Sequence, residues 1–317
     1  MSTVPFKLEG DSFETIELND VKKSKEYFVR QSKKEDVDTN SEGATTKPTE
    51  RSKEREVKKN IIFPNFKAET IKIENYFFKK VQFNSSEFKK VTFKSCKFED
   101  CLFVNAHFIS VEFHDVEFKN CNLWKASFEK CYVDPKIFKF DSVFERDAPN
   151  IALTLYHALL KNSREECQME RARNSDLEFK RWMHLNEIYE VSRDGPRTNA
   201  LSKLLRLYKW KYHFLRFFSN HGYGPGRLLI WTTVLFGAVS WLNYFVIGSD
   251  LSISGNRVDS ISFIDALYYT FSILTLLGFS FIVPDSTCAK ILTIFEALCS
   301  VGWLGYLQAC FVKRYLP

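Results

Sequence analysis

Several features that mark common classes of protein are missing from this chain. Its first residues, MSTVPFKLEGDSFE, have neither a basic start nor an apolar core, so we expect no signal peptide. None of its eight cysteines belongs to a CxxC pair or to a Cys/His spacing typical of zinc sites. A phosphate-binding loop and a nucleophile elbow are also missing. We therefore expect no metal, no cofactor and no enzymatic activity.

Apolar side chains are scarce in residues 30–60, where Val37, Ala44 and Val57 interrupt a polar and charged run. Such a segment cannot bury enough surface to offset the entropy lost on ordering. We predict a disordered insert over 30–60, within an N-terminal segment that covers 1–60.

Long apolar runs are confined to the last third of the chain, at 228–247 and 289–312. Each has about twenty residues or more, and at ~1.5 Å per residue this length crosses the ~30 Å hydrocarbon layer of a bilayer. Basic residues crowd 193–227, and Lys313 and Arg314 follow the second run. This charge pattern predicts a multi-pass protein of the cell inner membrane with both termini in the cytoplasm. We prefer this interpretation of the basic block to binding of nucleic acid.

The segment between the two runs, 262–284, has the pattern of a re-entrant pore loop. Ser262 followed by Asp265 is a helix start signal, which places the first helical residue near Phe263. The helix should end around 274–275, and a glycine-containing extended stretch should follow as far as Pro284. Backbone of this kind occurs at membrane depth only inside protein or along a watery path.

The same segment resembles the pore signature of the two-span potassium-channel-like family. The family's Thr-Val-Gly-Tyr-Gly falls on 276–280, and the resemblance implies a selectivity filter made of Thr275, Leu276, Leu277, Gly278, Phe279 and Ser280. Leu276 lacks the hydroxyl group of the family's threonine, and Ser280 replaces a glycine, which adopts positive φ without steric cost. These two departures leave the permeant ion open. A single copy cannot enclose a path, so a homotetramer in a lipid bilayer is implied.

The second apolar run carries a polar stripe with helical spacing. Its members are Thr293, Glu296, Ser300, Leu304 and Gln308. A polar stripe on a membrane helix faces the bundle or water, so we expect the last four residues to line the pore or to support the filter. Glu296 either lines the vestibule or braces the filter loop, and the family resemblance favours bracing. Gly302 and Gly305 are candidates for a gate hinge, with small-residue helix packing as the alternative.

A period of five residues runs through the middle of the chain. Aromatic or aliphatic residues stand at every fifth position from Phe78 to Phe138, and a small or β-branched residue usually stands two positions before each of them. The pattern resembles the pentapeptide-repeat family, whose chain forms a square right-handed β-solenoid. We expect such a solenoid over 61–140, with about three coils at ~4.8 Å each. The phenylalanines and the four cysteines of this region should pack inside it.

Leu8, Phe13, Leu18 and Phe28 share the same register, so we expect residues 6–28 to form an opening coil. Helical spacing returns at 147–191, where we predict two helices arranged as a hairpin. Residues 199–218 combine aromatics with cations, which favours a helix at the membrane surface over a cytosolic packing helix. Arg171-Ala-Arg173, Phe179-Lys-Arg-Trp182 and the segment from Ser219 to Gly226 resemble the connector that joins pentapeptide repeats to an ion-channel module. The resemblance implies a connector over 147–226 and a channel module over 227–317.

These observations predict a multidomain membrane protein with an N-terminal β-solenoid, a helical connector and a two-span α-helical pore module. The leading functional hypothesis is a tetrameric channel of the inner membrane that conducts cations. Its solenoid would gate the pore or dock an unknown cytoplasmic partner. One alternative is a non-conducting scaffold anchored in the membrane, motivated by Leu276 and Ser280. Another is an effector pore that depolarises its own cell under stress or phage attack.

Overall fold

The computed structural model describes residues 12–28, 55–194, 210–246, 250–253, 256–257, 261–275, 278 and 281–315. The chain divides into two compact units, Met1–Leu205 and Arg206–Pro317. Each unit is considered by itself below.

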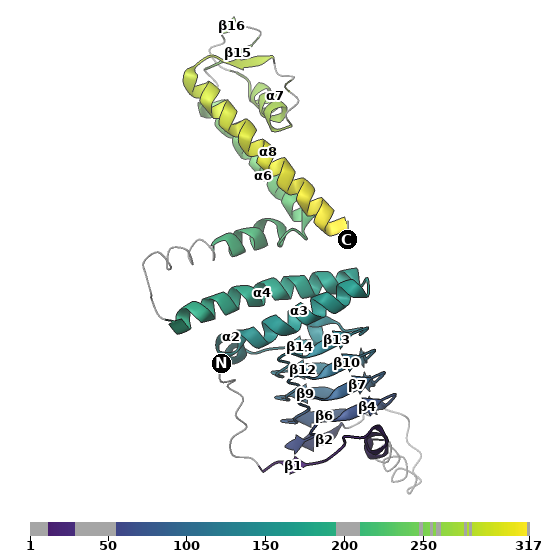
Figure 1. Ribbon diagram of the computed structural model, residues 1–317. Helices are drawn as coiled ribbons and strands as arrows, with labels where there is room; N and C mark the ends of the chain where they lie inside the picture. The colour runs from purple at the N-terminus through teal and green to yellow at the C-terminus, as the bar shows by residue number, and fades with distance from the viewer. Residues whose placement is uncertain are drawn as a thin grey trace, which may run out of the picture. The chain divides into compact units, whose positions relative to one another are not determined.

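The first unit contains a β-solenoid in which parallel strands are stacked coil on coil (Figure 1). Partners in the sheets stand twenty positions apart, as Phe78 and Phe98 do, so each coil consists of four five-residue sides. Three sides form parallel sheets, and the fourth is joined by single bridges such as Gln82 to Leu102. The first sheet consists of β2 (Glu56–Lys59), β6 (Tyr76–Lys79), β9 (Lys97–Glu99), β12 (Glu117–Lys119) and β14 (Phe138–Lys139). The second sheet consists of β4 (Lys67–Glu69), β7 (Glu87–Lys89), β10 (His107–Ile109) and β13 (Ser127–Glu129). The third sheet consists of β5 (Lys72–Glu74), β8 (Thr92–Lys94) and β11 (Glu112–His114).

The five-residue period fills the interior with aromatic rings. Phe98 stacks between Phe78 and Phe118, with ring centroids 4.9 and 4.7 Å apart. Cys96, Cys101, Cys121 and Cys131 occupy the inward position two residues before a central residue of the repeat, which is Phe98, Phe103, Leu123 and Val133 in turn, and all four are buried. The predicted packing of the phenylalanines and cysteines is confirmed.

Each corner of the solenoid is made by a residue in the left-handed region. A positive φ between 48° and 62° recurs at every fifth residue from Asn60 to Lys130. No glycine occupies these corners, and Asn, Asp, Ser and Lys supply most of them. Asn and Asp tolerate this conformation because their short side chains bond to the nearby backbone.

The solenoid is longer than predicted, with about four turns rather than three. Residues 56–59, assigned above to the disordered insert, form strand β2 and pair in parallel with β6. The pairing uses backbone groups, so this strand does not need the apolar side chains whose scarcity led to the prediction of disorder. The rest of the predicted insert lies almost wholly outside the described residues.

The N-terminal segment adds to the first coil only in part. Strand β1 (Glu14–Thr15) pairs in parallel with β3 (Ile61–Ile62), and Leu18 O accepts a hydrogen bond from Lys67 N at 3.1 Å. Residues 21–28, however, form a helix rather than a coil. Phe28 on this helix packs edge-on against Tyr76 at 5.5 Å and closes the open end of the core. Leu8 lies outside the described residues.

The opposite end of the solenoid is closed by helices. They follow the short turn η1 (Pro135–Ile137) and consist of α2 (Ser142–Asp147), α3 (Pro149–Glu165) and α4 (Met169–Asp194). Asn162 on α3 accepts a hydrogen bond from Cys131 N at 3.0 Å and donates one to Cys131 O at 2.9 Å. These two bonds satisfy backbone groups that the last coil would otherwise leave exposed at a sheet edge.

The second unit contains two long helices, α6 (Pro225–Val246) and α8 (Thr287–Tyr315), with the short helix α7 (Phe263–Leu274) between them in sequence. Strand β15 (Leu251–Ile253) pairs antiparallel with both β16 (Asn256–Arg257) and β17 (Ile282–Pro284). Both α6 and α8 are long and apolar enough to span a membrane. Figure 1 shows α7 beside the end of this helix pair that carries β15. Residues 210–219, within the predicted interfacial segment, are helical.

Candidate pore site

The short helix α7 begins where its sequence predicts. The Ser262 side chain accepts a hydrogen bond from Ile264 N at 3.4 Å, and Asp265 accepts one from Ser262 N at 3.3 Å. This reciprocal pair is a complete capping box, which satisfies donors that the first helical turn leaves free. The predicted first residue, Phe263, and the predicted end near Leu274 are both confirmed.

The end of α7 is held by α8. Leu274 O accepts a hydrogen bond from the hydroxyl of Ser300, which is buried on α8. The backbone of Thr275 then leaves the helix, and Gly278 follows with φ +67°. A Cβ at Gly278 would meet nothing within 4 Å, so glycine is required there by the backbone conformation rather than by space. The other predicted filter residues, Leu276, Leu277, Phe279 and Ser280, lie outside the described residues.

A buried polar cluster joins the three helices of the unit. Asn243 on α6 donates hydrogen bonds from Nδ2 to Thr270 Oγ1 at 2.9 Å and to Glu296 Oε2 at 3.3 Å. Thr270 belongs to α7 and Glu296 to α8, so one amide links all three helices. Asn243 and Thr270 are fully buried, and Glu296 is 7% exposed. Glu296 is therefore linked through Asn243 to α7, the helix that precedes the predicted filter loop.

Tyr269 and Thr293 form a second tie between α7 and α8. Their hydroxyl oxygens lie 2.6 Å apart, and Thr293 also donates to Ala289 O at 2.8 Å. Thr293 and Ser300 thus join α8 to α7, and Glu296, which lies between them in sequence, accepts from Asn243 on α6. These three residues are the N-terminal part of the polar stripe that the sequence indicates.

The segment that follows the predicted filter is also fixed. Strand β17 pairs with β15, and Ser286 donates to Asp250 Oδ2 at 2.8 Å. Ser286 also accepts a hydrogen bond from Ala289 N at 3.1 Å, in the first turn of α8. The loop is consequently anchored on both sides, by α7 before it and by this small sheet after it.

The remaining predicted residues of α8 lie further along the helix. Leu304 is half-buried, and Gln308 is exposed in the single chain. Helix α8 runs without a break through Gly302 and Gly305, and a Cβ at either glycine would meet nothing within 4 Å. No close approach within this chain therefore requires these glycines.

The far end of α8 contacts the turn that follows the helical residues 210–219. The hydroxyl oxygens of Ser219 and Tyr306 lie 2.5 Å apart, and Lys313 Nζ donates to His221 O at 3.0 Å. The ammonium group of Lys313 also lies 4.3 Å from the centre of the Tyr223 ring. Gly222 has φ +88°, and a Cβ there would approach Lys313 Cδ to 3.2 Å. The turn and the end of α8 thus fit closely together.

Several of these residues were missed by the sequence analysis, among them Asn243, Tyr269 and Tyr306. Asn243 could have been found, because a polar residue inside an apolar span usually marks a functional or packing contact. Tyr269 and Tyr306 carry no such signal, since tyrosine is common in apolar helices and only the tertiary structure supplies the partner hydroxyl.

Comparison with protein families agrees with this geometry. Residues 228–316 match the family model described as ion channel, and residues 86–124 match that of pentapeptide repeats, in eight copies. No curated protein matches the chain. The chain is thus a membrane protein with two candidate spans, and these spans lie in its ion-channel domain. More specifically, it joins a pentapeptide-repeat β-solenoid to an ion-channel domain.

Proposed function

We propose that four copies of this chain form a cation-conducting channel in the cell inner membrane, with both termini in the cytoplasm. The observation that carries the proposal is that the short helix α7 is hydrogen-bonded to both long helices. Its last carbonyl group, Leu274 O, accepts a hydrogen bond from Ser300, and its Thr270 hydroxyl accepts one from Asn243. A helix that merely packed on its neighbours would not require hydrogen bonds to both spans. A helix that supports a filter does require such hydrogen bonds, because carbonyl groups that replace an ion's hydration shell must be held in place.

The direction of α7 supports a cation as the permeant ion. The carbonyl end of a helix carries partial negative charge, and this end leads directly into Thr275 and Gly278. In a tetramer four such ends would converge near the axis and favour a cation. Thr275 to Ser280 would form the filter, with Glu296 and Ser300 as its support and Leu304 and Gln308 along the path below it.

Gating would act through the other end of α8. The Ser219–Tyr306 and Lys313–His221 contacts join the helix over 210–219 to α8. A basic aromatic helix lies readily at a lipid surface, so its movement would pull on α8. Gly302 and Gly305 are then the proposed hinge. The solenoid would supply the stimulus by docking a partner in the cytoplasm.

The test is a recording of the full-length protein in planar bilayers. Under a K⁺ gradient opposed by Na⁺, and then under a Cl⁻ gradient, we expect unitary currents whose reversal potential follows the cations. Replacing Gly278 with alanine should abolish them, since alanine in the left-handed region is strained by about 1–2 kcal/mol. Exchange of the exposed Gly237 for alanine serves as the control, because a Cβ there meets nothing and its φ is not positive.

The absence of current under any ligand, voltage or pH would favour the scaffold alternative. In that case the Gly278 variant should keep its partner binding and its effect in the cell. The effector-pore alternative predicts that opening the channel stops growth of the cell that makes it.

A further inference from the structure

A cavity of about 470 Å³ lies between the last coil of the solenoid and the helices that close it. One wall comes from η1 and β14, through Pro135, Lys136, Phe138 and Lys139. The other comes from α4, through Asn174, Leu177, Glu178 and Arg181. Its size falls within the ~300–1,000 Å³ range of small-molecule sites. All of these residues belong to the first unit.

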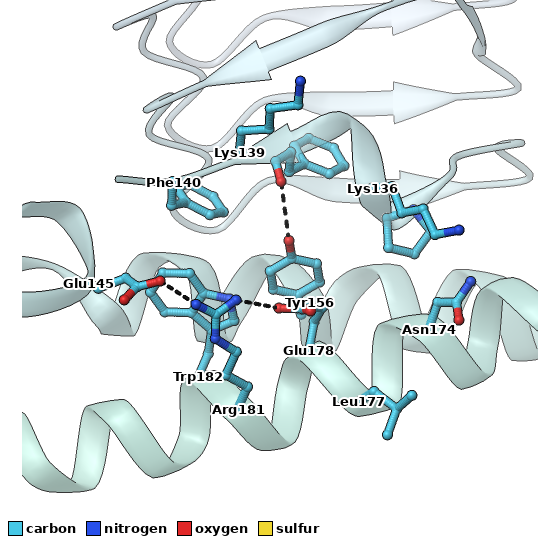
Figure 2. A pocket seen from close by; sticks show the side chains of 12 residues that line it. Lys136, Lys139, Phe140, Glu145, Tyr156, Asn174, Leu177, Glu178, Arg181 and Trp182 are labelled. Atoms are coloured by element: carbon cyan, nitrogen blue, oxygen red, sulfur yellow. Dashed lines mark hydrogen bonds and ion pairs between the residues drawn. The ribbon is translucent and has the colours of Figure 1, made fainter. Parts of the chain in front are cut away.

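The floor of the cavity is aromatic. Phe140 and Trp182 pack edge-on with ring centroids 5.1 Å apart, and Tyr156 stands beside them (Figure 2). Tyr156 directs its hydroxyl group toward Phe138 O, at the long distance of 3.5 Å. The Nε1 atom of Trp182 is buried and has no hydrogen-bond partner among the described residues. Tyr156 and Trp182 are themselves buried, at 3% and 1% exposed, so the partly exposed Phe140 supplies the open part of this floor.

The charged residues of the cavity are not equally available to a ligand. Figure 2 shows Arg181 between Glu145 and Glu178, and it forms ion pairs with both, the second at 3.5 Å. Arg181 holds both carboxylates within the wall, and its single positive charge offsets one of their two negative charges. Lys139 pairs at 3.1 Å with Glu117, outside the cavity. Lys136 is exposed and forms no ion pair within the described part of the chain.

We propose that this cavity binds a small organic anion, a flat ring that carries a phosphate or carboxylate group. The ring would lie on the aromatic floor, and the anionic group would meet Lys136, with Lys139 beside it. Arg181 and Lys139 are both paired with carboxylates, so Lys136 is the lining cation left for a ligand in the described part of the chain, and this favours an anion over a cation. A bound ligand would join the last coil to α4, which precedes the ion-channel domain in sequence.

The experiment uses full-length protein in lipid nanodiscs and equilibrium dialysis of two matched sets of probes. The first set is AMP, adenosine and inorganic phosphate; the second is indole-3-acetate, indole and acetate. We expect the ring-and-anion member of at least one set to bind saturably, and its two partial counterparts to bind at least about tenfold more weakly. This pattern would support both the aromatic floor and the anion contact.

Lys136→Ala should weaken the binding by about tenfold or more, since a charge-assisted hydrogen bond contributes about 1.5–3 kcal/mol. Lys125→Ala is the matched control, because Lys125 is an exposed solenoid lysine that does not line the cavity. The proposal is overturned if no probe saturates, if the partial counterparts bind equally well, or if the two variants lose affinity equally. Ion conduction is not part of this readout, so the channel proposal stands or falls separately.

Discussion

Asn243 shows how much a single side chain contributes to the pore site. Its amide donates to Thr270 and Glu296, and each of the three residues belongs to a different helix. In an apolar environment an unpaired carboxylate oxygen is costly, and Glu296 Oε1 already lacks a partner among the described residues. Loss of the Asn243 amide would also remove the hydrogen bond to the other carboxylate oxygen, Glu296 Oε2.

Asn243→Leu should therefore destabilise the helix cluster by about 1–3 kcal/mol and abolish or strongly reduce unitary conductance. Leucine has a similar size but cannot donate a hydrogen bond. Ser240→Ala is the control, because Ser240 is equally buried but donates only to Phe236 O of its own helix. Single-channel recording and thermal unfolding in detergent measure the two effects. Normal conductance in the leucine variant would contradict the bracing role.

The solenoid cysteines give a second prediction at the residue scale. Burial raises the pKa of the Cys96 thiol and that of the Cys131 thiol from 9.0 to about 11 each. Both thiols stay neutral in the folded chain at pH 8 and should react with iodoacetamide far more slowly than the exposed Cys167. Mass spectrometry of the alkylated peptides measures this. Equal labelling of Cys96 and Cys167 in folded protein would show the inward packing to be wrong.

The same shift fixes the sign of the pH dependence. The folded pKa lies above the unfolded one, so the neutral thiols contribute full stability below pH 9. Above pH 9 the unfolded chain loses these protons while the folded chain keeps them. Stability should consequently decline as the pH rises from about 9 through 11.

At the scale of the element, the corners of the solenoid combine a fixed backbone with variable side chains. Every fifth residue has a positive φ, and Thr70 is the β-branched residue among them, with φ +54°. A β-branched side chain is unfavourable in this region, whereas asparagine is tolerated.

Thr70→Asn should therefore stabilise the solenoid by about 1 kcal/mol. Thr92→Asn makes the same chemical change within strand β8 and should instead destabilise slightly, because asparagine is a poor strand former. Thermal unfolding followed by circular dichroism compares the two variants. A lower Tm for the Thr70 variant than for the unaltered protein would contradict the assigned role of the corner.

At the scale of the whole molecule, the two units differ in where their apolar side chains lie. The solenoid buries a column of rings in its interior, while α6 and α8 leave large apolar side chains such as Ile230, Trp241, Ile294 and Leu298 exposed in the single chain. Exposure of this kind is expected of helices that meet lipid and other copies of the chain. A signal between the units would have to reach α8, and the contact of Ser219 with Tyr306 is one route within the second unit.

Tyr306→Phe removes this hydroxyl contact and keeps the ring. We expect a changed open probability with unchanged unitary conductance, since the contact lies on α8 away from the filter. Tyr315→Phe is the control, because Tyr315 is 67% exposed. Recordings in planar bilayers separate the two quantities. A changed unitary conductance in the Tyr306 variant would place this residue on the conduction path instead.

The amino-acid sequence by itself determined the elements whose signals are local or periodic. A five-residue period can be read without knowledge of the fold, and so can the capping box at Ser262 and the length of the two apolar runs. The tertiary structure decided the rest: the strand at 56–59, the helix at 21–28, and the hydrogen bonds that join Asn243, Thr270 and Glu296. A strand that pairs through its backbone leaves little trace in its side chains. A hydrogen bond between residues distant in sequence exists only once packing has brought them together.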